Sequence, residues 1–121
     1  MHKEIADKWV EALRSGEYEQ TQHALHDGVG FCCLGVLCDL FPGRQWLEST
    51  TIHHLSGACR AEGVIDSCAL PSPVRLWAGL AESNPRVSVG GSNECLTELN
   101  DVQNKSFSQI ADLIEAQWES M

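Results

Sequence analysis

The sequence is poor in basic residues. Lysine and arginine together number 8, against 17 aspartates and glutamates, and the formal net charge at pH 7 is −9. Proteins bind DNA and RNA largely by neutralising phosphates with lysine and arginine side chains. The charge balance therefore argues against a polynucleotide partner, but it leaves room for a small anion in one local pocket.

The start of the sequence lacks the apolar segment that a secretory signal or a membrane span would need. It reads MHKEIADKWVEALRSG, a charged and amphipathic stretch. We therefore expect a cytoplasmic protein with no membrane partner. In a reducing cytosol the 6 cysteines should remain thiols, so their even number does not indicate disulfides.

The common catalytic and cofactor motifs are also missing. The sequence contains no Walker loop, dinucleotide glycine fingerprint, nucleophile elbow or zinc-protease helix. No cysteine pair has the Cys-x2-Cys spacing of a structural zinc site. We therefore predict no catalytic residue, no cofactor and no metal site, which lowers the expectation of an enzyme without excluding one.

What the sequence does contain is typical of one folded domain spanning residues 1–121. Its hydrophobic fraction is 43% and includes four tryptophans. Apolar residues recur with helical spacing over 3–13 and 107–118. Gly16 is expected to cap the end of the first of these helices, and Ser106 with Gln109 forms a capping box before the second.

Shorter elements are predicted between these helices. In LPSPVRLWAGL, Ser72 is expected to cap a helix that Gly79 ends, with Val74, Trp77 and Leu80 on its buried side. Asp27-Gly28 is a turn signal that predicts a hairpin of strands 18–26 and 29–32. Short strands are expected at 45–47, 64–65 and 86–89, and segment 94–101 is open between strand and helix, with helix favoured. The prediction is an α+β fold: a helix-rich small single domain with a short β-hairpin or small antiparallel sheet.

The stretch FCCLGVLCDL, residues 31–40, holds three of the cysteines among leucines and a valine. Cys33, Leu34 and Leu37 follow helical spacing, which favours a buried helix over a buried strand. Gly35 in that helix indicates close packing of another backbone segment. The cysteines are expected to fill the core, since unpaired cysteine is among the most buried residue types.

Two functional roles for these cysteines stay open. A metal site could combine Cys32 or Cys33 with His23 or His26 and a distant cysteine. Alternatively, a cysteine at the start of the helix could act as a nucleophile with one of those histidines as its base.

Recognition groups are expected in loops and at the ends of elements. A nucleotide-type ligand is typically held by an aromatic ring against its base and by arginine against its phosphates. Trp9, Trp77 and Trp118 lie on helical stripes and are expected in the core. The predicted ligand-binding residues are Arg14, Tyr18, Gln20, Arg44, Trp46, Arg86, Asn100 and Asp101.

The segments RSGEYEQ, FCCLGVLCDL, LPSPVRLWAGL and SFSQIADLIE together resemble a family of small uncharacterised proteins encoded by bacteriophages and prophages. The resemblance covers nearly the whole chain and is weakest over residues 44–63. It implies a single-domain viral protein in the cytoplasm of an infected bacterial host. It carries over no catalytic residues.

Small phage accessory proteins often act on host defence, so the resemblance implies a counter-defence role. The first hypothesis is a binding protein that sequesters a small nucleotide-derived immune signal without catalysis. Such a protein could be a homo-oligomer. The alternative is an acidic inhibitor that docks on a host defence protein, because an acidic surface can imitate nucleic acid. A third and less favoured hypothesis is a cysteine- or zinc-dependent enzyme.

Overall fold

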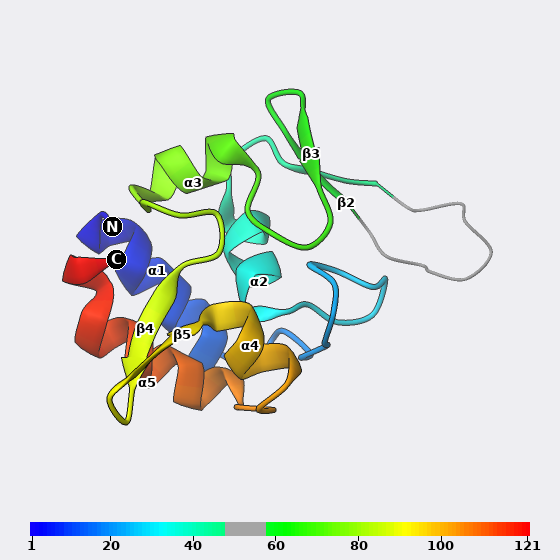
Figure 1. The fold of residues 1–121 in the computed structure, drawn as a ribbon. Helices are drawn as coiled ribbons and strands as arrows, with labels where there is room; N and C mark the ends of the chain where they lie inside the picture. The colour runs from blue at the N-terminus through cyan, green and yellow to red at the C-terminus, as the bar shows by residue number, and fades with distance from the viewer. Residues whose placement is uncertain (48–57) are drawn as a thin grey trace.

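The two terminal helices pack against each other, as Figure 1 shows in a computed structural model that describes residues 1–47 and 58–121. Helix α1 spans Lys3–Arg14 and buries its apolar stripe, with Trp9 fully covered. Helix α5 spans Phe107–Gln117 and begins at the predicted capping box, and a 3-10 turn, η1 (Trp118–Ser120), follows it. Both predicted helices are confirmed, and the chain ends lie together beside them.

The cysteine-rich stretch forms the central helix α2 (Cys33–Leu40), as predicted. Its side chains from Cys33 to Cys38 are buried. The thiol of Cys32 caps the helix by accepting a hydrogen bond from the backbone N–H of Gly35 at 3.4 Å. A Cβ atom at Gly35 would collide with the backbone carbonyl of Leu25, which confirms the close packing predicted for this glycine.

A three-stranded antiparallel sheet lies at one end of the molecule, to the right in Figure 1. Its strands are β1 (Gln45–Leu47), β2 (Ala58–Ala61) and β3 (Val64–Asp66), in that order. The strands predicted at 45–47 and 64–65 are confirmed. Strand β2 was not predicted, because ACRA lacks the β-branched and aromatic residues that favour strands.

Helix α3 spans Ser72–Ala78 and ends at Gly79, whose φ of +74° is the left-handed conformation predicted for a glycine cap. The predicted N-terminal cap was wrong by one position, since Ser72 is the first helical residue and Pro71 precedes it. Val74 and Leu80 are buried as expected. Trp77 is half-buried, with its ring edge-on to Phe41.

Segment 94–101, for which the sequence allows a strand or a helix, contains the end of a strand and a helix. Strands β4 (Arg86–Val89) and β5 (Ser92–Cys95) form an antiparallel hairpin, and helix α4 (Leu96–Asp101) follows without a gap. The change occurs where Leu96 is drawn into the core, because its side chain is fully buried and its N–H donates to the carbonyl of Pro85 at 2.9 Å.

The hairpin predicted at 18–32 was wrong. Residues 18–32 contain only isolated bridges, Gln20 with Phe31 and His26 with Phe31. The turn itself exists, because the carboxylate of Asp27 accepts hydrogen bonds from the N–H groups of Val29 and Gly30 at 2.9 and 2.7 Å. The N–H of Leu25 bonds outside the segment, to the carbonyl of Ser67, and Phe31 pairs with Gln20 in a parallel bridge that an antiparallel hairpin would not contain.

The observed architecture is the predicted α+β class. One cluster of buried side chains runs from Ile5 on α1 to Ile114 on α5 and includes residues of α2, α3 and α4. Among the described residues, no helix has the length and apolar character needed to cross a membrane.

Candidate functional site

The predicted ligand-binding residues lie at four places rather than in one site. Two sets of three come together, and two arginines stand apart. Tyr18, Arg44 and Trp46 meet at the carboxylate of Asp39, and Gln20, Asn100 and Asp101 meet at the end of α4. Arg14 lies where α1 contacts α5, and Arg86 lies on strand β4.

The carboxylate of Asp39, near the end of α2, gathers the first set. Its Oδ2 accepts a hydrogen bond from the Tyr18 hydroxyl at 2.7 Å, and its Oδ1 accepts from the Trp46 indole N–H at 3.0 Å. Arg44 donates to the same Oδ1 from Nε and Nη2 at 3.2 and 3.1 Å. Burial alone would raise the pKa of Asp39, but these hydrogen bonds and the guanidinium charge lower it below its usual value.

The aromatic rings around Asp39 pack on one another. Phe31 stacks on the His26 imidazole with centroids 4.0 Å apart and lies edge-on to Tyr18 and Trp46 at 5.1 and 5.7 Å. These distances are those of rings in mutual contact. His26 and Phe31 therefore cover one face of each other's rings, and a base would have to separate this pair to stack between them.

The two outlying arginines lie against carboxylates. Arg14 joins α1 to α5 through Asp112 at 2.6 Å and Glu115 at 2.7 Å. Arg86 lies 3.7 Å from the carboxylate of Glu82. A phosphate that bound either guanidinium would compete with a carboxylate already beside it.

Asn100 is a fully buried polar side chain at the centre of the second set. Its Oδ1 accepts from Gln20 Nε2 at 2.8 Å and from the N–H of Cys33 at 3.3 Å. Its Nδ2 donates to the carbonyl of Thr21 and to Oδ1 of Asp101, both at 2.8 Å. Asn100 therefore holds loop 20–26, the start of α2 and the end of α4 together.

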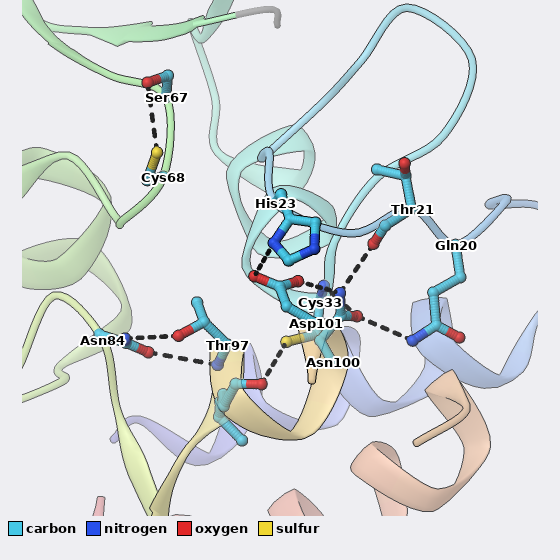
Figure 2. Close-up of polar contacts among 11 residues, drawn as sticks. Gln20, Thr21, His23, Cys33, Ser67, Cys68, Asn84, Thr97, Asn100 and Asp101 are labelled. Carbon is cyan, nitrogen blue, oxygen red and sulfur yellow. Dashed lines mark hydrogen bonds and ion pairs between the residues drawn. The ribbon is translucent and has the colours of Figure 1, made fainter. Parts of the chain in front are cut away.

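A cleft of about 300 Å³ opens beside Asn100. Loop 20–26, the start of α2, the segment after β3, the loop before β4 and helix α4 all contribute to its walls. Ala24 and Ala69 supply apolar surface. The polar lining residues are His23, Cys32, Cys68, Asn84, Thr97 and Asp101, most of which Figure 2 shows around the open space.

His23 and Asp101 face each other at one side of the cleft, with the imidazole beside the carboxylate in Figure 2. His23 Nδ1 lies 3.9 Å from Asp101 Oδ2, which is longer than a hydrogen bond. The side chain of His23 is 76% exposed, whereas that of Asp101 is 16% exposed. His23 has a φ of +66°, a strained conformation for a residue with a side chain.

Asn84 and Thr97 form the other side of the cleft as a pair. Asn84 Nδ2 donates to the Thr97 hydroxyl at 2.7 Å, and the N–H of Thr97 donates to Asn84 Oδ1 at 3.5 Å. The amide thereby caps the first turn of α4 from a separate loop. In the described part of the chain no acceptor takes the hydroxyl proton of Thr97, so it can donate into the cleft.

Two walls of the cleft are connected through the backbone of Leu25. Leu25 is fully buried, and its N–H donates to the carbonyl of Ser67 at 2.9 Å. Its own carbonyl accepts from the N–H of Cys32 at 3.2 Å and lies against Gly35. Leu25 therefore fixes the loop that carries His23 to the segment that carries Cys68.

The cysteines divide into buried and accessible groups. Cys32, Cys33, Cys38 and Cys59 are buried, whereas Cys68 is exposed. The core role predicted for the cysteines of α2 and its cap is thus confirmed. Burial raises the pKa of the Cys32 thiol to about 11 and that of Cys33 well above its usual value, so both are protonated at neutral pH.

The described residues contain no group of three or more histidine, cysteine, aspartate or glutamate side chains arranged to hold a metal ion. The metal site that would combine Cys32 or Cys33 with His23 or His26 therefore has no geometric support among the described residues. Cys32 lines the cleft as a neutral thiol.

The cleft offers hydrogen-bond acceptors and one negative charge. Among its described lining residues there is no lysine or arginine, and Asp101 carries the formal charge. Asn84 and Thr97 add polar groups, and the two alanines supply apolar contact. Such a site suits a small molecule that presents N–H donors or a positive charge.

Sequence reasoning placed Asp101 in a binding site but missed His23, Cys68, Asn84 and Thr97 as cleft residues. The sequence suggests His23 only as a metal ligand or a base, and the hairpin prediction places it in a strand. Asn84 precedes a proline, and nothing in its local sequence indicates that it caps a helix 12 residues later. The cleft forms through tertiary contacts, so no local pattern marks it.

Comparison with known proteins supplies a family but no described activity. No curated protein and no solved structure matches the chain. A family model described as a domain of unknown function (DUF8296) matches residues 1–118, and the chain therefore belongs to that family.

Proposed function

We propose that this protein binds a small nucleotide-derived molecule in the cleft beside Asn100 and holds it without changing it. The observation that carries the proposal is the cleft itself, about 300 Å³ in volume and built from separate chain segments with hydrogen-bonding side chains. Small-molecule sites have this character: concave, partly apolar, with a few converging polar groups.

The resemblance of the sequence to phage proteins supplies the biological setting. In this proposal the protein is a phage counter-defence factor in the cytoplasm of the infected host, and its ligand is an immune signal. Capture rather than cleavage is supported by Cys32, which lines the cleft as a protonated thiol, and by the mutual pairing of Asn84 with Thr97. The exposed thiol of the cleft, Cys68, lies 3.6 Å from the hydroxyl of Ser67, and among the described residues no histidine hydrogen-bonds to it as a base.

Calorimetric titration tests this function. The purified protein is titrated with nucleosides, nucleotides, ADP-ribose and cyclic dinucleotides, and any bound ligand is recovered after denaturation and analysed by mass. We expect at least one of these ligands to bind and to be recovered unchanged. Absence of binding by all of them would refute the function, and a cleaved product would refute capture.

A cleft-filling variant locates the site. Ala69→Phe adds a ring inside the cleft, and Ala116→Phe adds the same ring on the exposed surface of α5. We expect Ala69→Phe to abolish binding and Ala116→Phe to leave it unchanged, with thermal unfolding showing that both variants fold. Equal binding by the two variants would place the site elsewhere.

A second candidate function is docking on a host protein through acidic surface. A groove of about 510 Å³ between α1 and α5 is lined by three carboxylates, those of Asp7, Glu11 and Glu115, and by one guanidinium, that of Arg14. Capture of one host protein from lysate, lost at high salt and lost in Glu11→Lys, would support docking. A captured protein that persists in Glu11→Lys would exclude the groove.

A further inference from the structure

We infer that the cleft recognises the N–H donor edge of a guanine-type base and leaves the phosphates of its ligand outside. The inference rests on the proposed function and specifies the class of ligand. It differs from the sequence prediction, in which arginines met the phosphates.

The acceptor for such a base is the carboxylate of Asp101. Its Oδ1 accepts one hydrogen bond from Asn100, and in the described part of the chain its Oδ2 accepts none. A carboxylate has lone pairs for about four hydrogen bonds. Asp101 can therefore accept further donors while Asn100 holds it in position.

A guanine base carries a ring N–H and an exocyclic amino group side by side, and these two donors match the two oxygens of a carboxylate. Planar pairs of this kind are among the stronger hydrogen-bonded arrangements in proteins, because the acceptor is ionised. Adenine has no ring N–H at the equivalent edge, and hypoxanthine lacks the exocyclic amino group. The geometry thus distinguishes three bases of similar size.

The remaining cleft residues suit the body of a base. The His23 ring is 76% exposed and stands beside Asp101, where it can stack on a planar ligand. Ala24 and Ala69 supply apolar contact, and the Thr97 hydroxyl can donate to a base carbonyl. The volume of about 300 Å³ is at the lower end of ligand pockets, which fits a base or nucleoside.

The charge distribution keeps phosphates out of the cleft. No lysine or arginine occurs among the described lining residues, and the whole chain carries a formal charge of −9. The arginines at positions 14, 44 and 86 each lie beside a carboxylate elsewhere. Each added phosphate brings negative charge toward an acidic protein, so affinity should fall as phosphates are added.

The first experiment compares ligands that differ by one group. Guanosine, inosine and adenosine are titrated into the protein, followed by GMP, GDP and GTP. We expect guanosine to bind best, inosine about tenfold weaker because one hydrogen bond to a charged acceptor is lost, and GTP weaker than guanosine. Chemical shift changes in labelled protein should map to His23, Asn84 and Thr97 and not to the α1–α5 groove.

The second experiment changes the acceptor. Asp101→Asn keeps an oxygen that can accept from Asn100 but places an amino group where the carboxylate faced the ligand. Asp112→Asn removes the same charge from the surface of α5 and is the matched control. We expect Asp101→Asn to weaken guanosine binding at least tenfold and Asp112→Asn to leave it unchanged, with both variants checked by thermal unfolding.

The outcomes separate this inference from the proposed function. Nucleotides that bind more tightly with each phosphate, or without preference for guanine, would overturn the inference and leave the proposed function standing. Equal guanosine binding by Asp101→Asn and Asp112→Asn would also overturn it. If no nucleoside or nucleotide binds, both the function and the inference fail.

Discussion

The buried side chain of Asn100 links three segments of the chain through hydrogen bonds. Its four hydrogen bonds have lengths of 2.8 to 3.3 Å. Replacing Asn100 leaves the buried N–H of Cys33 and the partly buried carbonyl of Thr21 without that partner. Unpaired buried polar groups cost free energy, because folding removes them from water.

We expect Asn100→Ala to lower the free energy of unfolding by about 2–4 kcal/mol, the cost of leaving two such groups unpaired. Urea denaturation followed by tryptophan fluorescence measures this change. Asn93→Ala, on the exposed face of β5, serves as control and should change stability by less than about 0.5 kcal/mol. Similar losses in both variants would contradict the role assigned to Asn100.

Tyr18 is the only tyrosine in the chain, so tyrosinate absorbance reports on it alone. Burial, followed by the hydrogen bond to Asp39, raises the pKa of Tyr18 to about 12. In Asp39→Asn we expect this pKa to fall toward the ordinary value of 10 without reaching it, since burial persists. Spectrophotometric titration measures it, with circular dichroism confirming that the fold persists.

The control for this titration is Asp7→Asn, which removes an exposed carboxylate on α1. It should leave the pKa of Tyr18 where it is in the unmodified protein. An identical pKa in Asp39→Asn and the unmodified protein would show that the hydrogen bond from Tyr18 to Asp39 is absent in solution.

At the scale of elements, α2 depends on the absence of a side chain at Gly35. Alanine favours a helix over glycine by about 1 kcal/mol, so helix propensity alone predicts a stabilised Gly35→Ala variant. The backbone carbonyl of Leu25 makes the substitution destabilising instead, because it occupies the position that the Cβ atom of alanine would take.

We expect Gly35→Ala to destabilise the protein by about 3 kcal/mol, as overpacking of a dense core does. Gly43→Ala is the control: its φ of +81° is strained for alanine, but no described atom lies within 4 Å of the added Cβ. It should cost about 1 kcal/mol. Thermal and urea unfolding of the two variants measure the difference, and a stable Gly35→Ala would contradict the packing.

The helices could be predicted from the sequence because their signals are local. The capping box at Ser106 and the glycine at position 79 act within one turn of the residues they cap. The hairpin at 18–32 could not, because the partners differ from those of a hairpin: Leu25 bonds to Ser67 outside the segment, and Phe31 pairs with Gln20 in a parallel bridge. Strand signals describe a tendency to be extended and do not identify the partner.

At the scale of the whole molecule, four thiols are enclosed by the fold and two are reachable. Cys32, Cys33, Cys38 and Cys59 are buried, whereas Cys68 is exposed and Cys95 is half-buried. Thiol reagents attack the thiolate and need access to it. Modification of the enclosed thiols therefore requires the protein to open.

We expect a disulfide reagent such as Ellman's to modify Cys68 quickly, Cys95 more slowly, and the four buried thiols only as the protein unfolds. Labelling in increasing urea should follow the unfolding curve. Cys68→Ser should remove the fast phase and leave the others. Rapid modification of three or more thiols in the native protein would contradict the described burial.

The candidate cleft also belongs to this scale, which explains why the sequence did not reveal it. Asp101 was predicted as a binding residue from its place before the last helix, but its neighbours come from positions 23, 68, 84 and 97. Spacing of that kind has no periodicity to detect. The prediction of an arginine-led site remains untested by binding, although the structure places its arginines beside carboxylates.

The backbone bond from Leu25 to Ser67 has a kinetic consequence. It joins two walls of the cleft to each other and, through the buried side chain of Leu25, to the core. We therefore expect the cleft to be preorganised, so that a ligand binds without a slow rearrangement of these two segments. Stopped-flow traces should accordingly show a single exponential whose rate rises linearly with concentration, without a plateau.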